Sequence, residues 1–225
     1  YKEVDPYTIR RFSDVVDETI LRMILRGFGH ILKASLTIIE PNFDPIQTGR
    51  KFRRIDPINP DEHLNVYCER VRKDEKGRRE CKRSVYEIVK ERFNEKGEYF
   101  DYCWAGMKKL FAPLMIDNIP IGFLVCGEMQ GDGSEEKNEI EKGIKQVSEN
   151  LKISEEELRS LIEKNPNKPK VLSKEDIDKR KKEIDALKKS LENLGENNYK
   201  SKIQAMEQEF LKEVDALFNI KYETP

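Results

Sequence analysis

The sequence predicts an α+β domain in which helices cover a mainly antiparallel sheet. Between Tyr99 and Gln130, apolar and other residues alternate as they do in strands, and Asp117-Asn118 divides the stretch where a tight turn fits. On both sides of this stretch, apolar residues recur every three or four positions, which is typical of helices. The resulting order of elements is helix, strand, helices, three strands and helices.

Composition and charge exclude several classes of protein. Apolar residues make up 37% of the 225 residues and charged residues 38%, so we expect long solvated helices around a modest core. The net charge of -1 gives no electrostatic basis for binding nucleic acid or an anionic membrane. No apolar run reaches the roughly 18 to 20 residues of a membrane span, and four cysteines are too few for a disulfide scaffold. We therefore expect a cytoplasmic protein with no nucleic-acid or membrane partner of its own.

The first sixty residues predict a lead-in, a helix, a strand and a loop. After the lead-in Tyr1–Phe12, Ser13 caps a helix that runs to about Lys33. The apolar face of this helix comprises Val16, Ile20, Met23, Ile24, Phe28 and Ile31. Ala34–Ile39 is predicted to be a short buried strand. Asn42–Asp61 holds three prolines and little periodicity, which predicts a long loop.

Two helices and the three strands of the sheet follow. His63–Asn94 predicts a short helix that contains Cys68 and, after Gly77, a second helix. The predicted strands are Tyr99–Cys103, Leu110–Ile116 and Ile121–Met129, of which the last two form an antiparallel hairpin. Helices at 135–150 and 154–165 complete a domain that we delimit as residues 13–165.

Residues 166–225 predict a C-terminal helical hairpin. Ser173 caps the first helix, Gly195–Asn198 forms a turn, and a second helix follows. The apolar stripes of the two helices are Ile177, Ile184, Leu187, Leu191 and Leu194, and then Tyr199, Ile203, Met206, Phe210, Val214 and Leu217. Two roles stay open for this hairpin. It covers the sheet of its own domain, or it forms the stalk of a homodimer and carries a signal onward.

The four cysteines are candidate ligands for a metal or a small molecule. Cys68 and Cys81 lie on predicted helices, whereas Cys103 ends one strand and Cys126 lies within another. In a domain whose helices cover a sheet, four such thiols can converge, and a converged set suits zinc or an iron–sulfur cluster. Their spacing includes no C-x-x-C pair, however, and the alternative is that each cysteine is a small buried apolar residue.

Four further residues are candidates for a ligand pocket beside the sheet. In the last strand, alternation places Glu128 on the same face as Cys126, either toward solvent or as a polar anchor beside that thiol. Trp104, at the end of the first strand of the stretch, is either core or a surface on which a ligand stacks. Gly106 allows backbone to come close to another group. Phe111, on the next strand, completes the candidate ligand-binding set.

The sequence contains no enzyme motif. Neither His30 nor His63 has metal-binding or catalytic spacing around it. The patterns G-x-S-x-G, H-E-x-x-H, G-x-G-x-x-G and the P-loop are all missing from the sequence. We therefore expect no catalytic residue.

Several tracts of the sequence resemble the PocR sensory domain family. They are Ser13-Asp14-Val15-Val16-Asp17, Cys68, Gly77-Arg78-Arg79-Glu80-Cys81-Lys82-Arg83-Ser84, Tyr102-Cys103-Trp104-Ala105-Gly106-Met107, Ala112-Pro113-Leu114, Ile121-Gly122-Phe123-Leu124-Val125-Cys126-Gly127-Glu128 and Val171-Leu172-Ser173. The resemblance covers residues 10 to 195. Because three separate cysteine-centred tracts match, it is more specific than any single motif.

The resemblance implies a PAS-like module that binds small organic molecules such as diols and hydrocarbon derivatives and is attached to transcription regulators, histidine kinases or similar outputs. The positions that fall on the family pattern are Cys68, Cys81, Cys103, Ala105, Gly106, Pro113, Gly122 and Gly127. Two positions depart from it: Trp104 stands where a His commonly follows the third Cys, and Glu128 where a Gln is frequent. The loss of that His puts a metal or polar contact in doubt and makes Cys126 a candidate substitute ligand.

The leading hypothesis is therefore a sensory domain that binds a small, partly apolar ligand between the sheet and the helices of Cys68–Phe93. Ligand binding would then bias an output domain through the C-terminal helices. One alternative keeps the fold but uses a cysteine-held metal or cluster as a redox or gas sensor. Another, from a different class, is an oligomerisation module driven by the C-terminal hairpin.

Overall fold

The computed structural model of the 225-residue chain describes residues 11–32, 34–42, 51–57, 65–95, 97–116, 118–129, 133–163 and 174–220. The expected lead-in lies almost wholly outside these ranges, as do the boundary stretch 165–170 and the capping residue Ser173.

Five antiparallel strands form one sheet in the order β2-β1-β5-β4-β3. They are β1 (Ser35–Asn42), β2 (Lys51–Ile55), β3 (Tyr99–Tyr102), β4 (Lys108–Ile116) and β5 (Ile119–Met129). The strands predicted near residues 99, 110 and 121 are confirmed, as is the α+β class with its antiparallel sheet. The tight turn between β4 and β5 is reached through Asn118, whose φ of 62° is one that asparagine adopts more readily than most residues.

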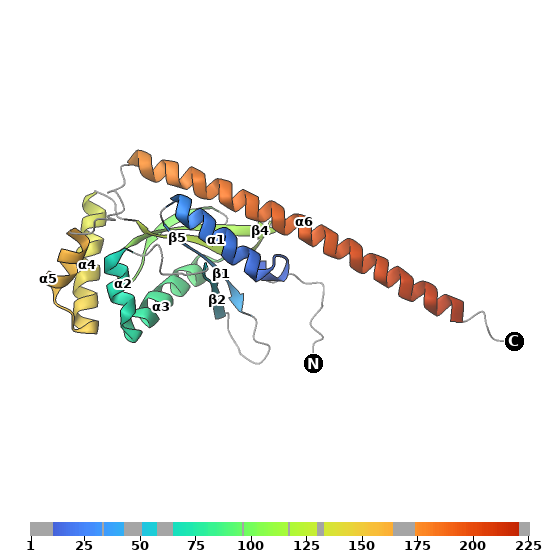
Figure 1. Cartoon of the computed structure of the whole chain (residues 1–225), viewed down its shortest axis with the longest axis horizontal. Coiled ribbons are helices and arrows are strands. Elements are labelled where there is room, and N and C mark those ends of the chain that lie inside the picture. The colour runs from blue at the N-terminus through green and yellow to red at the C-terminus, as the bar shows by residue number, and fades with distance from the viewer. Residues whose placement is uncertain are drawn as a thin grey trace.

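The described residues also form a short 3₁₀ helix and six α-helices, of which α4 and α5 lie at one end of the molecule beside α2 and α3 (Figure 1). They are η1 (Phe12–Asp14), α1 (Glu18–Leu32), α2 (Val66–Lys73), α3 (Glu75–Glu91), α4 (Ser134–Leu151), α5 (Glu155–Glu163) and α6 (Lys174–Ile220). Side chains cap the two central helices: Asn65 accepts from the Cys68 N–H at 2.7 Å, and Asp74 accepts from Lys76 N at 2.8 Å and from Gly77 N at 3.2 Å. Within the described ranges, no helix is long and apolar enough to cross a membrane.

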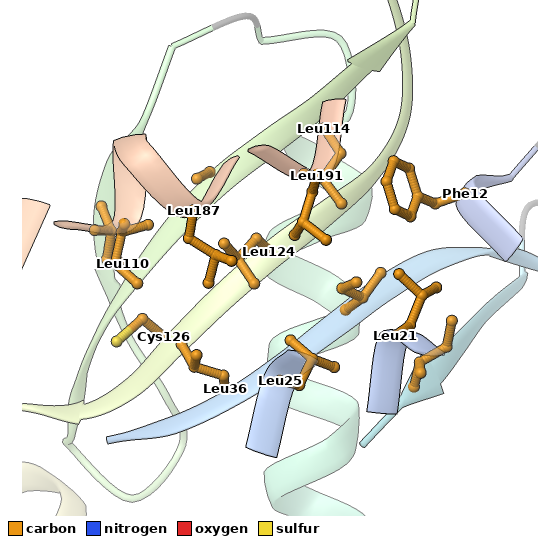
Figure 2. Packing of buried hydrophobic residues seen from close by; sticks show 14 of the residues in the cluster. Phe12, Leu21, Leu25, Leu36, Leu110, Leu114, Leu124, Cys126, Leu187 and Leu191 are labelled. Carbon is orange, nitrogen blue, oxygen red and sulfur yellow. The ribbon is translucent and has the colours of Figure 1, made fainter. Parts of the chain in front are cut away.

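The two faces of the sheet have separate cores. On one face α1 and α6 pack against β1, β4 and β5 and form the α6-side core (Figure 2). Its fully buried members include Leu25, Leu36, Leu110, Leu114, Leu124, Leu187 and Leu191. On the opposite face α3 packs an aromatic core that contains Val85, Val89, Phe93, Tyr99, Phe111 and Phe123. A third cluster joins α2, α4 and α5 to the loop between β3 and β4.

Two expectations for the first third of the chain are wrong in detail. The segment predicted as an uninterrupted loop, Asn42–Asp61, contains the strand β2, which pairs with β1 from Ile38 to Asn42. Helix α1 buries Leu21, Leu25 and Leu32, whereas Ile20, Met23 and Ile31 of the predicted apolar face are exposed. The apolar residues of α1 form one arc that is wider than the face packed on the sheet, so periodicity alone did not show which part of that arc is buried.

The predicted C-terminal hairpin is also wrong, because α6 is a single continuous helix of 47 residues. The residues read as a turn make tertiary contacts instead. A Cβ atom on Gly195 would lie 3.0 Å from Ile116 Cδ1 and 3.1 Å from Phe12 Cε2, so glycine permits close packing on the sheet. The side-chain amide of Asn198 donates to the Val15 carbonyl at 3.0 Å. Beyond this point α6 continues past the sheet toward the C-terminus (Figure 1).

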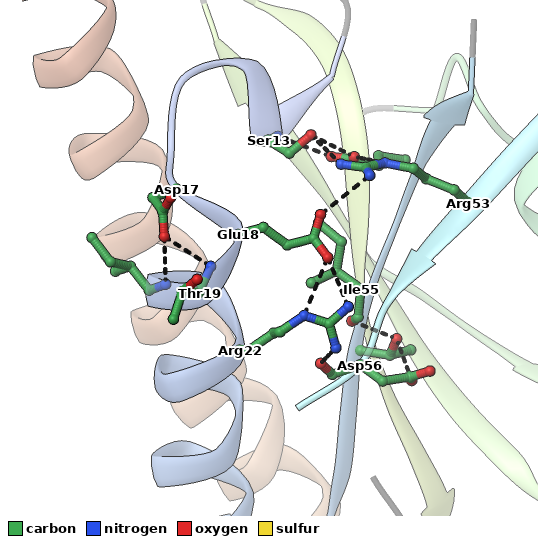
Figure 3. Close-up of polar contacts among 11 residues, drawn as sticks. Ser13, Asp17, Glu18, Thr19, Arg22, Arg53, Ile55 and Asp56 are labelled. Carbon is green, nitrogen blue, oxygen red and sulfur yellow. Dashed lines mark hydrogen bonds and ion pairs between the residues drawn. The ribbon is translucent and has the colours of Figure 1, made fainter. Parts of the chain in front are cut away.

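A buried carboxylate fixes the N-terminal segment to the sheet. Glu40 on β1 is fully buried, and it accepts from Ser13 N at 3.0 Å and from Ser13 Oγ at 2.7 Å. Arg53 on β2 forms an ion pair with Glu40 and donates to Ser13 Oγ, and it reaches Glu18 on α1 at 3.2 Å (Figure 3). Buried charges need such partners, because removing one leaves the other uncompensated in a poorly solvated site.

We expect Arg53→Met to lower the free energy of unfolding by about 3 kcal/mol, because it leaves Glu40 buried without its cation. Arg22→Met is the matched control, since Arg22 pairs with Glu18 at 2.7 Å where both side chains are 37% exposed. That exposed pair contributes about 1 kcal/mol or less. Urea denaturation of both variants measures the difference, and equal costs would contradict the assigned role of Glu40.

Candidate functional site

The loop between β3 and β4 is held by three helices. Tyr67 of α2 donates its hydroxyl hydrogen to the Ala105 carbonyl at 3.1 Å, and Ser84 of α3 accepts from Trp104 N at 3.2 Å. Helix α4 approaches so closely that a Cβ on Gly143 would lie 2.6 Å from Gly106 N. Gly106 has a φ of 77°, and a Cβ there would lie 2.9 Å from the Ile140 Cα. Both glycines are therefore required by backbone packing.

A small cavity lies between this loop, the sheet, α2 and α3. Its volume is about 40 Å³. Its wall comprises Ser35, Thr37, Arg54, Cys68, Val71, Arg72, Cys81, Val85, Cys103, Ala105, Lys109, Val125, Gly127 and Glu128. Residues from strands β1, β2, β4 and β5 thus meet residues from two helices and one loop. The space is sufficient for roughly three water-sized groups.

Glu128 reaches the cavity because β5 departs from regular alternation. The register between β4 and β5 shifts between Lys108 and Leu110, and Glu128 has a φ of 70°. As a result Glu128 and its neighbour Gly127 both line the cavity, whereas Cys126 faces the α6-side core. Glu128 accepts from Asn65 N at 3.0 Å and so also anchors the start of α2. Alternation therefore wrongly placed Glu128 on the same face as Cys126: Glu128 is buried and lines the cavity, but that thiol is not beside it.

Lys109 also faces the cavity, from β4. Its ammonium group lies against Gly127, where any Cβ atom would collide with it. The ammonium is enclosed by protein atoms, although the residue as a whole is half-buried. Among the described residues, Lys109 makes no hydrogen bond or ion pair, and its charge acts at longer range on Cys103, Glu128 and Cys68.

Burial governs the ionisation of the thiols and carboxyl group in this wall. It raises the pKa of Cys68 well above its usual range and that of Cys81 to about 12. It also raises the pKa of Glu128, although Lys109 opposes that shift. For Lys109, burial lowers the pKa, but the facing Cys103 and Glu128 outweigh this and leave it raised. At neutral pH the wall therefore presents the Lys109 ammonium and the protonated thiols of Cys68 and Cys81, and protonated thiols are poor nucleophiles.

The structure brings together only part of the predicted ligand set. Cys68, Cys81, Cys103 and Glu128 line the cavity, but Trp104, Gly106, Phe111 and Cys126 do not. The Trp104 indole packs in the third cluster, the one that joins α2, α4 and α5 to the loop. Its Nε1 donates to Gln146 Oε1 at 2.9 Å when the Gln146 amide is oriented so that both its oxygen and its nitrogen have partners. Phe111 stacks on Tyr99 in the aromatic core, with ring centroids 5.1 Å apart.

The fourth cysteine is separated from the other three by the sheet. Cys126 is fully buried in the α6-side core, and its partners on the neighbouring strands are Leu36 and Leu110 (Figure 2). Of the two alternatives for the cysteines, convergence of all four thiols on one zinc or iron–sulfur site is therefore contradicted. In the part of the chain that the structure describes, no group of three or more His, Cys, Asp or Glu residues is arranged to hold a metal.

The sequence interpretation missed the basic and hydroxyl groups of the wall, namely Ser35, Thr37, Arg54, Arg72 and Lys109. One signal was present. On β4 strict alternation puts Lys109 on the same face as Phe111, and that face is covered by α3. A lysine at an inward position of a buried strand is unusual and indicates a polar site.

Comparison with known proteins identifies the class of domain. A family model described as the sensory domain found in PocR matches residues 14–199, which is well over half of the chain. The chain therefore belongs to the PocR sensory domain family, and its role is sensory. Searches among curated proteins and among solved structures found no match to this chain.

We expect Trp104→Ala to lower the free energy of unfolding by about 3 to 5 kcal/mol, because the indole is core rather than part of the cavity wall. Trp104→Phe should cost less, since it keeps most of the apolar contact and loses only the hydrogen bond to Gln146. Chemical denaturation measures both costs. A small loss for Trp104→Ala would contradict the placement of the indole in solid packing.

A second prediction concerns alkaline pH. The folded protein holds the thiol protons of Cys81 and Cys126 up to a pKa of about 12 and about 11, against 9.0 for an unperturbed thiol. Their contribution to stability is therefore complete below about pH 9 and is lost as the pH rises toward these values. We expect the free energy of unfolding to fall over this range, and to fall less steeply in Cys126→Ala. Identical slopes for the two proteins would contradict the prediction.

Proposed function

We propose that this sensory domain binds a small organic molecule in the cavity between the sheet and helices α2 and α3, and does no chemistry on it. The observation that carries the proposal is the cavity wall, where polar groups from several distant segments converge on an enclosed space. Convergent polar groups in a small, partly apolar cavity are typical of ligand sites. The apolar part of the wall is Val71, Val85, Ala105 and Val125.

The same two strands connect this cavity to α6. Val125 and Lys109 face the cavity, whereas their neighbours Leu124 and Leu110 pack in the α6-side core. Polar contacts also join α6 to the sheet: Met115 N donates to Glu192 Oε1 at 2.8 Å, and Lys188 pairs with Glu98 at 2.9 Å. We infer that an occupied cavity shifts β4 and β5, and that α6 passes the shift to an output domain.

Partners and location follow from the same proposal. The output is a module attached to this domain, such as a histidine kinase or a transcription regulator, and the domain itself has no nucleic-acid or membrane partner. Its four cysteines are free thiols, which supports a cytoplasmic location. The length of α6 favours a second role in homodimer formation, because the helix continues well past the residues that dock on the sheet.

The experiment compares the thermal unfolding and the amide hydrogen exchange of the whole chain with and without small probes such as acetate, acetamide and propane-1,2-diol. We expect at least one probe to raise Tm in a saturable manner, because a ligand that binds only the folded state stabilises it. The same probe should change amide exchange in the docked part of α6. Failure of every small probe to bind would contradict the proposal.

A matched pair of variants on α3 tests whether the rise in Tm caused by the probe comes from binding in this cavity. Both Val85 and Val89 belong to the aromatic core, but only Val85 also lines the cavity, and Val89 lies one turn further and is fully buried. Val85→Leu should be tolerated and should abolish the response to the probe, because it fills the cavity. Val89→Leu should cost about 1 to 3 kcal/mol by overpacking and leave the response intact.

A further inference from the structure

Lys109 is the one wall residue whose charge has no partner in contact among the residues that the structure describes. Arg54 is paired with Asp56 at 2.7 Å, and Glu128 accepts a hydrogen bond from the backbone N–H of Asn65. Since no described group lies within hydrogen-bond or ion-pair distance of this ammonium, its N–H donors are available to a bound ligand. Gly127 makes the arrangement possible, since a side chain at that position would displace the ammonium from the wall.

The groups around Lys109 favour an anion over a cation. The charged residues of the wall are Arg54, Arg72, Lys109 and Glu128, of which three are cationic. The single carboxylate already accepts a hydrogen bond from the backbone. The neighbouring thiols of Cys68 and Cys81 are held protonated by burial, so they add S–H donors rather than negative charge.

We propose that the cavity takes a short-chain carboxylate, whose carboxylate group pairs with Lys109 while its alkyl end lies against Val71, Val85 and Val125. This inference rests on the proposed function and narrows it to one chemical class. A cavity of about 40 Å³ admits a ligand of roughly three to five non-hydrogen atoms without rearrangement. Acetate and propionate have this size, and a charge-assisted pair with an enclosed ammonium supplies most of their binding.

The test compares carboxylates with their neutral isosteres at constant ionic strength. Titration calorimetry and thermal unfolding of the whole chain are measured with acetate, propionate, acetamide, propionamide and propane-1,2-diol, and with sodium chloride as the salt control. We expect saturable binding of the two carboxylates and about tenfold weaker or undetectable binding of the amides. Binding of an amide or the diol without the carboxylates overturns the assignment to Lys109 but leaves the proposed function intact. If none of the five probes binds, both the assignment to a carboxylate and the proposed function are overturned.

Three variants test the role of the charge itself. Lys109→Met should lose carboxylate binding by about tenfold or more, because it removes the ammonium that pairs with the ligand. Lys108→Met is the matched control on the same strand: it breaks the 2.6 Å pair with Glu136 and should leave carboxylate binding unchanged. Glu128→Gln keeps an oxygen that accepts from the backbone N–H of Asn65 but removes the negative charge from the wall. It should therefore tighten carboxylate binding. Unchanged carboxylate binding in folded Lys109→Met would overturn the inference. If Lys109→Met does not fold, unchanged binding in Glu128→Gln would overturn it instead.

Discussion

The burial of β5 on both of its faces is the constraint on which the rest of the structure depends. The strand lies between β1 and β4, and every residue from Ile121 to Met129 is buried. A central strand of this kind is stable only if helices exclude water from both sides. Helices α1 and α6 cover one side and α3 covers the other. The candidate site and the proposed signalling helix therefore lie on opposite faces of one strand.

The cavity exists where this strand stops being regular. The shift in register and the left-handed backbone at Glu128 turn two successive residues toward α2 and leave the space beside them unfilled by apolar side chains. The loop from Cys103 to Met107 closes the same space, since Tyr67, Ser84 and Gly143 hold it in place. Groups that would be costly inside a continuous apolar core, above all Lys109, are thus concentrated at one irregular point of the sheet.

Much of the fold was predictable because its elements have strong local patterns. Alternation predicted β3, β4 and β5, and helical periodicity predicted α2 through α5. Two elements were misjudged for reasons that local pattern does not reveal. Gly195 and Asn198 resemble a turn but make contacts with Phe12, Ile116 and Val15 inside one helix. Strand β2 has few apolar residues, and it pairs with β1 through backbone register and the Arg53–Glu40 contact, which no local pattern in β2 indicates.

By itself the sequence determined the α+β class, the family resemblance and the sensory role, because these depend on residue pattern along the chain. It also pointed to Cys68, Cys81 and Cys103, whose side chains do share one cavity. Only the tertiary structure decided that Cys126 belongs to the other face, that Trp104 is core and that Lys109 lies in the wall. The physical reason is that one bulge changes the face on which every later residue of a strand lies, and that enclosure depends on helices distant in the sequence.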